Sequence, residues 1–267
     1  MKITRLLYIG AIVAVCGFTS CQNEQEEITT KEEISKDVLS QVTAMGFNNQ
    51  NVQRTEGGYI VEGDIFLSEE QLEKGFDSKA LRVGESEQYR TNNLVSVGSG
   101  RTIRVAITTS LPSSYVTALE EAIRRYNAEP LKIKFQRVSS NYEILFSKAP
   151  AGSTYLASAG FPSGGNPYNS VKVNSDYLGS NPGTNYLATI LAHEAGHCIG
   201  FRHTDYMDRS YSCGGSYSNE GASTVGAVHV PGTPSNQDPN SWMLACIGSG
   251  QNRPFNSNDK TALNYIY

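Results

Sequence analysis

The sequence of 267 residues predicts an α+β fold, from the order of its elements and from one histidine-rich helix. Segments with the alternating apolar pattern of a strand are grouped around a long amphipathic helix in the middle of the chain. A second long helix follows and contains the run His-Glu-Ala-Gly-His at residues 193–197. The 39% apolar content is enough for a substantial core, and the formal net charge of -4 argues against nucleic acid as the main partner.

Residues 1–20 have the composition of an export signal. Lys2 and Arg5 precede an almost unbroken apolar run over residues 6–18, which is too short to span a membrane readily. Small residues then lead to Cys21, a pattern that resembles the lipobox of bacterial lipoproteins. We therefore expect a lipoprotein of the bacterial outer membrane or cell surface, which contacts the membrane only through a lipid on Cys21. Secretion after cleavage near Cys21 is the alternative.

An acidic tether and a small α/β prosegment are expected next. Residues 21–37 are rich in Glu and Gln and predict a solvated tether. Residues 38–100 are assigned to the prosegment and its linker, which are too small for a core of their own. The elements predicted here are a helix at residues 34–45, a strand or hairpin arm at 57–67 and a second helix from Ser68. The polar residues 75–100 predict the linker and the place of activating cleavage.

Residues 101–267 are expected to form the main domain. Strands are predicted at residues 102–108, 131–138 and 142–146, and helices at 113–129, 185–198 and 257–266. The expected helix caps are Ser113 or Ser114 for the first of these helices and Ser257 or Asn258 for the last. Residues 204–240 lack apolar periodicity and contain turn markers, which predicts irregular structure.

The histidine-rich stretch has the spacing of a zinc site. On a helix, His193 and His197 lie about 40° apart around the axis and about 6 Å apart along it, close enough to share one ion. A continuing helix would point His203 away, so the chain must turn at Gly200, which enters the left-handed region without steric cost. Three histidines leave one coordination position open, as in catalytic zinc sites. Glu194 then lies beside the metal, where it can take a proton from water and pass it to a leaving amine.

Residues 193–203 resemble the motif of the metzincin zinc metallopeptidases, His-Glu-x-x-His-x-x-Gly-x-x-His. More narrowly, the run is similar to the His-Glu-Ile-Gly-His core of a group of bacterial metallopeptidases. The resemblance implies a twisted mixed sheet with helices, a zinc helix, and an irregular lower subdomain that ends in a helix. It also implies an antiparallel edge strand that lines the cleft and pairs with substrate, expected within residues 154–161.

The metzincin resemblance further implies a methionine turn beneath the metal. The run Ser-Trp-Met-Leu at residues 241–244 fits this turn, with Met243 as its methionine. Some relatives place a zinc-contacting tyrosine two residues after the methionine, but Ala245 occupies that position here. The role of that tyrosine is then unfilled or taken by another group, such as Tyr206 or Tyr211.

A second resemblance concerns the prosegment. The run Glu62-Gly63-Asp64-Ile65 resembles the prosegment motif of astacin-type metzincins, Phe-x-Gly-Asp-Ile, although Val61 precedes it where that pattern has Phe. The resemblance implies that Asp64 ligates zinc and displaces the catalytic water until an activating protease removes the segment. An ordinary tight Gly-Asp turn between strands is the alternative.

Three cysteines remain after the signal and Cys21, so one disulfide is possible. We favour Cys213 with Cys246 because both lie in turn-rich segments, and expect Cys198 to be a buried thiol. His229 lies outside every pattern and is expected to be a loop histidine.

The sequence thus predicts an exported, monomeric zinc endopeptidase that is made as a latent zymogen and acts on proteins or peptides. One alternative takes Glu220 as the third zinc ligand in place of His203. Another is a non-catalytic surface binding or adhesion lipoprotein that retains a zinc-peptidase fold. Glu194 argues against the latter, because a structural metal site does not need a general base.

Overall fold

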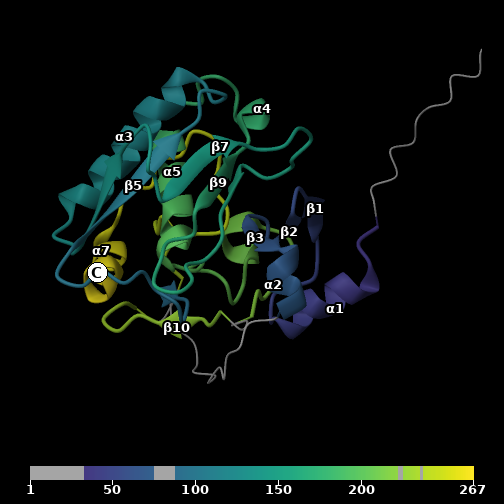
Figure 1. The fold of residues 1–267 in the computed structure, drawn as a ribbon. Coiled ribbons are helices and arrows are strands. Elements are labelled where there is room, and N and C mark those ends of the chain that lie inside the picture. Colours follow the sequence, from purple (N-terminus) through teal and green to yellow (C-terminus); the bar gives the residue numbers. More distant parts are fainter. Residues whose placement is uncertain (1–32, 75–87, 222–224, 235–236) are drawn as a thin grey trace, which may run out of the picture. The chain divides into compact units, whose positions relative to one another are not determined.

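A five-stranded mixed sheet supports the main domain (Figure 1). The computed structural model describes residues 33–74, 88–221, 225–234 and 237–267. The strand order is β6-β5-β7-β9-β8, with the strands β5 (Arg101–Ile107), β6 (Ile133–Arg137), β7 (Ile144–Lys148), β8 (Ala157–Ser158) and β9 (Ser170–Val173). Neighbouring strands are parallel except β8, which is antiparallel to β9. An antiparallel edge strand therefore lies within residues 154–161, where one was expected.

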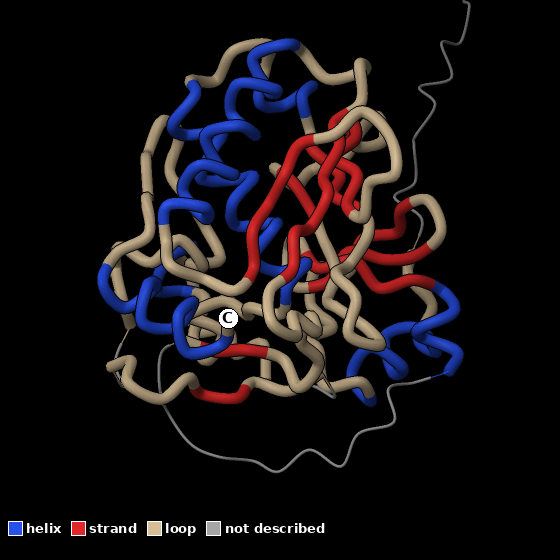
Figure 2. Tube along the Cα trace, turned by 60° about the vertical axis from the view of Figure 1, so that its left-hand side comes forward, coloured by secondary structure: helices blue, strands red, loops and turns tan. Residues whose placement is uncertain are grey.

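Two long helices pack together against this sheet. Helices α3 (Ser113–Ala128) and α5 (Thr184–Ile199) lie side by side on the same side of the strands (Figure 2). The hydroxyl of Tyr126 on α3 donates to the carbonyl of Ala192 on α5 at 2.8 Å. The expected serine cap of α3 is wrong, because Pro112 occupies the N-cap position and makes no side-chain hydrogen bond there.

Residues 36–74, for which a prosegment is expected and which keep that name below, form a three-stranded antiparallel sheet with two helices. The elements are α1 (Lys36–Ala44), β1 (Gln53–Thr55), β2 (Gly58–Val61), β3 (Ile65–Ser68) and α2 (Glu69–Lys74). Val42, Val61 and Ile65 belong to an apolar cluster that also contains Phe161 and Val225. Because the last two residues come from the main domain, the prosegment completes its core by packing on that domain.

The expected linker does not extend over residues 88–100. Strand β4 (Tyr89–Arg90) pairs with β10 (Val228–His229), and the Tyr89 side chain is fully buried. The amide of Thr91 also donates to the carbonyl of Gly200 at 2.8 Å, next to the end of α5. The rest of the expected linker, residues 75–87, lies outside the described residues, as do the export signal, Cys21 and most of the acidic tether.

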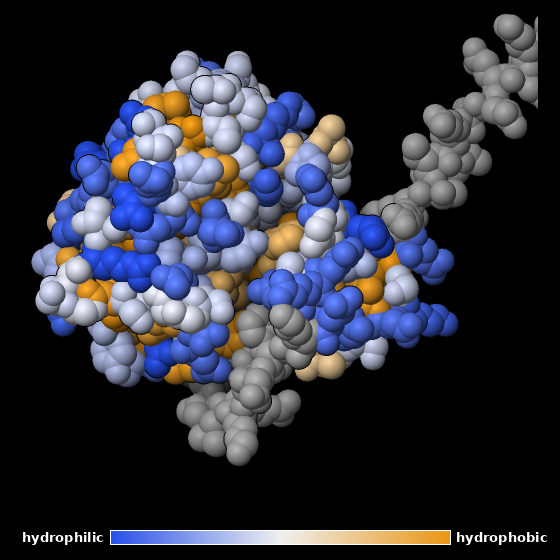
Figure 3. All heavy atoms as spheres, in the orientation of Figure 1, coloured by the Kyte–Doolittle hydropathy of each residue, from blue (hydrophilic) through white to orange (hydrophobic). Residues whose placement is uncertain are grey.

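The remaining helices are short, namely α4 (Ser175–Leu178), α6 (Ser210–Cys213) and α7 (Ser257–Ile266). The cap of α7 is Asn256 instead of Ser257 or Asn258, because the Asn256 and Asp259 side chains form a reciprocal capping box. Among the helices of the described ranges, none combines the length and apolar composition required to cross a membrane. On the face shown in Figure 3, polar residues surround scattered apolar ones.

Candidate active site and metal centre

Helix α5 brings two of the predicted metal ligands together. His193 and His197 are both buried, and their ring centroids are 4.6 Å apart. The helix ends at Gly200, whose backbone is left-handed with a φ of 111°. The chain turns there, and the ring centroid of His203 lies 4.8 Å from that of His197. The three histidines of the sequence motif are therefore adjacent.

Asp64 joins these histidines from the prosegment. Its Oδ2 atom lies 3.0 Å from Nε2 of His203, 3.4 Å from Nε2 of His193 and 4.0 Å from Nε2 of His197. The Nε2 atoms of His197 and His203 are 3.2 Å apart. Four tetrahedral ligands at about 2.0–2.1 Å from a zinc ion are separated by about 3.3 Å, so the spacing of these atoms fits one ion.

The hydrogen bonds of the histidines also fit a bound cation. The carbonyl oxygens of Trp242 and Phe201 lie 2.9 and 2.8 Å from Nδ1 of His193 and His197. Since a carbonyl only accepts, each Nδ1 carries a proton and each Nε2 presents a lone pair. The buried atoms Nε2 of His193 and Oδ1 of Asp64 have no hydrogen-bond partner among the described residues. Such atoms are expected where a metal ion binds.

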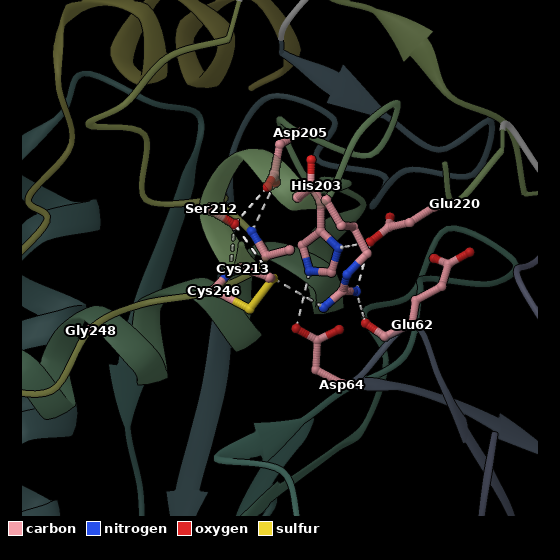
Figure 4. The surroundings of a disulfide bond; sticks show 12 residues. Glu62, Asp64, His203, Asp205, Ser212, Cys213, Glu220, Cys246 and Gly248 are labelled. Carbon is pink, nitrogen blue, oxygen red and sulfur yellow. Dashed lines mark hydrogen bonds and ion pairs between the residues drawn. A yellow bond between two sulfur atoms is a disulfide. The ribbon is translucent and has the colours of Figure 1, made fainter. Parts of the chain in front are cut away.

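Glu220 contacts the ring nitrogen of His203 that points away from the ligand cluster, so it does not lie among the metal ligands. Its Oε1 atom lies 2.8 Å from Nδ1 of His203, whereas Nε2 of the same ring faces Asp64 (Figure 4). The alternative in which Glu220 replaces His203 as a ligand therefore does not hold. Glu220 is buried, and it also contacts Arg202 and Arg209. The sequence carries no sign of this role, because it depends on how the irregular chain after His203 folds back.

Glu194 is buried beside the ligand cluster. Its Oε2 atom has no hydrogen-bond partner within the described part of the chain. Burial, and after it the charge of Asp64, raise the pKa of Glu194 well above its usual range. Burial acts on Asp64 in the same direction, but the histidines, His203 foremost, hold the pKa of Asp64 well below its usual range. Asp64 is therefore the ionised carboxylate of the two, and it disfavours ionisation of Glu194.

The predicted methionine turn packs directly under α5. Met243 is fully buried, and its sulfur lies 2.6 Å from the position that a Cβ atom at Gly196 would occupy. The glycine between the two helical histidines therefore allows the turn to approach the helix. The carbonyl of Met243 also accepts from the amide of Thr204 at 2.9 Å, which ties the turn to the residue after His203.

A disulfide joins Cys213 to Cys246, the pairing favoured from the sequence. It connects the end of α6 to the segment after the methionine turn (Figure 4). The hydroxyl of Ser212 adds a second link beside the disulfide. It donates to Asp205 at 2.6 Å and accepts from the amide of Cys246 at 2.9 Å. Cys198 is a free, fully buried thiol.

Asp64 lies in the turn between β2 and β3. Glu62 and Gly63 have φ values of 53° and 89°, so the tight turn expected as an alternative exists together with the contact to the histidines. The Glu62 carboxylate is fully buried and lies 3.2 Å from Nη2 of Arg202, which is equally buried. A buried ion pair between prosegment and main domain thus lies two residues before Asp64.

A pocket of about 230 Å³ opens beside the ligand cluster. It is lined by Asp64, His193, Glu194, Arg209, residues 154–157 before and within β8, and residues 244–247 after the methionine turn, among others. Neither Tyr206 nor Tyr211, the residues considered for the role of the missing tyrosine, lines this pocket. Tyr206 instead packs on Tyr89 with ring centroids 4.3 Å apart, and Tyr211 is 42% exposed. His229 is also remote from the cluster, with Nε2 at 3.0 Å from the hydroxyl of Thr233.

A family model described as a dual-action HEIGH metallo-peptidase matches residues 59–267. No curated protein matches the chain significantly. A structure of myroilysin is 15% identical, with a TM-score of 0.44, and the match covers 66% of this chain and 96% of that one. A second myroilysin structure is 14% identical, with a TM-score of 0.41 and coverage of 64% and 86%.

A further similar structure is high choriolytic enzyme 1, a hatching enzyme and zinc protease from the medaka fish Oryzias latipes. It is 16% identical, with a TM-score of 0.38, and the match covers 64% of this chain and 91% of that one.

Proposed function

The chain belongs to the HEIGH metallopeptidase family and is a zinc metallopeptidase, and from this premise we propose that it is a metzincin-type endopeptidase made in latent form. His193, His197 and His203 hold the zinc, and Glu194 is the general base. The arrangement of the three histidine rings supports this assignment most directly. The Nε2 atoms of the three histidines face one point, while the partners of their Nδ1 atoms fix the rings in place.

Glu194 moves the protons of the reaction. Zinc, when bound, supplies a Lewis acid that polarises the peptide carbonyl and lowers the pKa of water. The Glu194 carboxylate takes a proton from the attacking water and passes it to the leaving amine. A buried carboxylate with a raised pKa suits a group that must first accept a proton and then donate it.

Substrate lies along the edge strand β8 in extended form. The edge of β8, which the prosegment meets at the neighbouring Ala159, offers main-chain donors and acceptors to any extended peptide once the prosegment is removed, and the adjacent pocket accepts a side chain. Main-chain pairing requires no particular sequence, so proteins and peptides in general are the substrate class.

Latency comes from the prosegment. Asp64 takes the remaining zinc position, and the Glu62–Arg202 ion pair holds the turn that carries it. Because Asp64 also disfavours ionisation of Glu194, its removal both opens the metal site and frees the base. An activating protease cuts the chain between the prosegment and the main domain.

Export and lipid attachment complete the proposal. The disulfide supports an oxidising compartment, in agreement with a signal at residues 1–20 and a lipid on Cys21. Radioactive palmitate should label the protein in bacterial cells but not its Cys21→Ser variant. Equal labelling of the two would rule out this attachment site.

The peptidase assignment is tested on the full chain after limited proteolysis. The activated protein should digest casein and stop when a chelator removes the zinc. Glu194→Ala should be inactive while it retains one zinc per chain, whereas His203→Ala should lose the metal. Full activity of Glu194→Ala would exclude the mechanism. A zinc-loaded protein that cleaves no substrate in a peptide library would favour the adhesion alternative, which buried Glu194 otherwise argues against.

Latency has its own test in Asp64→Ala. The uncleaved variant should digest peptides without an activating protease, because its open zinc position admits water. Asp64→Asn keeps the shape of the side chain but removes its charge, and should give intermediate activity. If uncleaved Asp64→Ala stays as inactive as the wild type, Asp64 does not block the site.

A further inference from the structure

Arg209 contacts the prosegment backbone at the active-site pocket. It lies at the start of α6 and lines the same pocket as His193 and Glu194. Its Nη1 atom donates to the backbone carbonyl of Glu62. Its Nη2 atom lies 3.0 Å from the position that a Cβ atom at Gly63 would occupy. The guanidinium therefore lies directly against the main chain that leads to Asp64.

The same stretch of prosegment also contacts the sheet edge through its main chain. The amide of Ala159 donates to the carbonyl of Asp64 at 3.0 Å, and the amide of Phe66 donates to the carbonyl of Ala159 at 2.8 Å. Residues 64–66 thus pair with the sheet edge at Ala159, and Arg209 donates to the carbonyl of Glu62 in the turn just before them. None of these contacts depends on a prosegment side chain, so any peptide backbone can make them.

Arg209 is held in place independently of the prosegment. Its Nη1 atom lies 2.8 Å from Oε1 of Glu220, which belongs to the main domain. Helix α6, which follows Arg209, ends at Cys213, and the disulfide to Cys246 fixes that end against the segment that lines the pocket. A guanidinium has five N–H donors, so the pairing with Glu220 leaves donors for a ligand in the cleft.

We propose that Arg209 is a substrate-binding residue, whose guanidinium donates to a main-chain carbonyl of the bound peptide in place of the Glu62 carbonyl. The inference rests on the proposed peptidase function. Glu62 precedes the metal-facing Asp64 by two residues, so the substrate carbonyl lies away from the bond that is cleaved. A contact at that distance is made equally in the ground state and the transition state, and it acts mainly on KM.

The test compares Arg209→Gln, Arg209→Lys and a matched control in the full chain after limited proteolysis. Arg101→Gln is the control, because Arg101 is similarly buried, pairs with Glu143 at 2.8 Å and also donates to backbone carbonyls, but does not line the pocket. With a fluorogenic peptide, Arg209→Gln should raise KM about 10- to 100-fold, the loss expected for one charge-assisted hydrogen bond, with little change in kcat. Arg209→Lys should give a smaller rise, and Arg101→Gln none.

Zinc content and circular dichroism of each variant separate binding from folding. If Arg209→Gln loses its fold, Arg209→Lys carries the test, because it keeps the charge opposite Glu220 but lacks the fork of donors. An unchanged KM in a folded, zinc-loaded Arg209 variant would overturn this inference and leave the peptidase function intact. Failure of the wild type and of Arg101→Gln to cleave any peptide, with zinc bound, would overturn the proposed function itself.

Discussion

The Nδ1 atom of His203 lies 2.8 Å from Oε1 of Glu220, and both side chains are almost completely buried. The hydrogen bond fixes the orientation of the ring and places its proton on Nδ1, so that Nε2 is available to a metal. In His193 and His197, the partner of the Nδ1 atom is a backbone carbonyl instead of a side chain. His203, which follows the end of the helix, is therefore the histidine of the cluster whose ring orientation depends on another side chain.

Glu220→Gln should weaken zinc binding by about 10- to 100-fold, because a neutral amide holds the imidazole less firmly and makes it less basic. Competition with a chromogenic chelator measures the affinity. The matched control is Glu143→Gln, which removes a carboxylate that pairs with Arg101 on the sheet instead of with a metal ligand. Equal zinc affinity of Glu220→Gln and the wild type would contradict the positioning role.

Gly196→Ala should destabilise the protein, although alanine favours a helix by about 1 kcal/mol over glycine. The added Cβ would lie 2.6 Å from the sulfur of buried Met243, so the turn would have to move, at a cost of about 1–3 kcal/mol. Urea denaturation measures the change. In a Met243→Ala background, Gly196→Ala should cost less stability than it does in the wild type, because the sulfur that the added Cβ would meet is gone. Additive losses from the two changes would exclude the clash.

Glu62→Gln should loosen the prosegment on the main domain. It weakens the buried contact with Arg202, which keeps Glu220 as its second carboxylate partner at 3.5 Å, so the expected loss is about 1–3 kcal/mol, that of one hydrogen bond to a charged group. The uncleaved variant should gain peptidase activity while its zinc content stays the same. Glu69→Gln is the control, since its contact with Arg54 is exposed and such pairs contribute only about 0–1 kcal/mol. Identical latency of the two variants would show that the buried pair does not hold the prosegment.

Asp259 should make the protein less stable as the pH rises through the weakly acidic range. Its burial raises the pKa of Asp259 from 3.8 to about 7. Between about pH 4 and pH 7 the folded protein therefore holds a proton that the unfolded chain has lost, and stability falls by up to about 4 kcal/mol before it levels off. Asp259→Asn should remove this part of the slope. Denaturant titrations at several pH values compare the two proteins, and parallel pH profiles would contradict the prediction.

Local regularity explains which elements the sequence predicts well. The alternating and helical apolar patterns place β5, α3, α5 and α7 to within about two residues of their observed ends. The caps of α3 and α7 are predicted wrongly, because runs of Ser and Asn offer several equivalent capping residues and only the course of the incoming chain selects one.

For the metal centre, the sequence by itself determines His193, His197, His203 and the neighbouring carboxylate of Glu194, because helical spacing and one left-handed glycine place them without reference to the rest of the chain. The tertiary structure decides the contacts around them. Asp64 and His203 are 139 residues apart in sequence, and Glu62 and Arg202 are 140 apart. The prosegment hairpin and the irregular segment after α5 meet there because each buries apolar surface or charge that it cannot bury alone, and no local pattern records which segment will supply the partner.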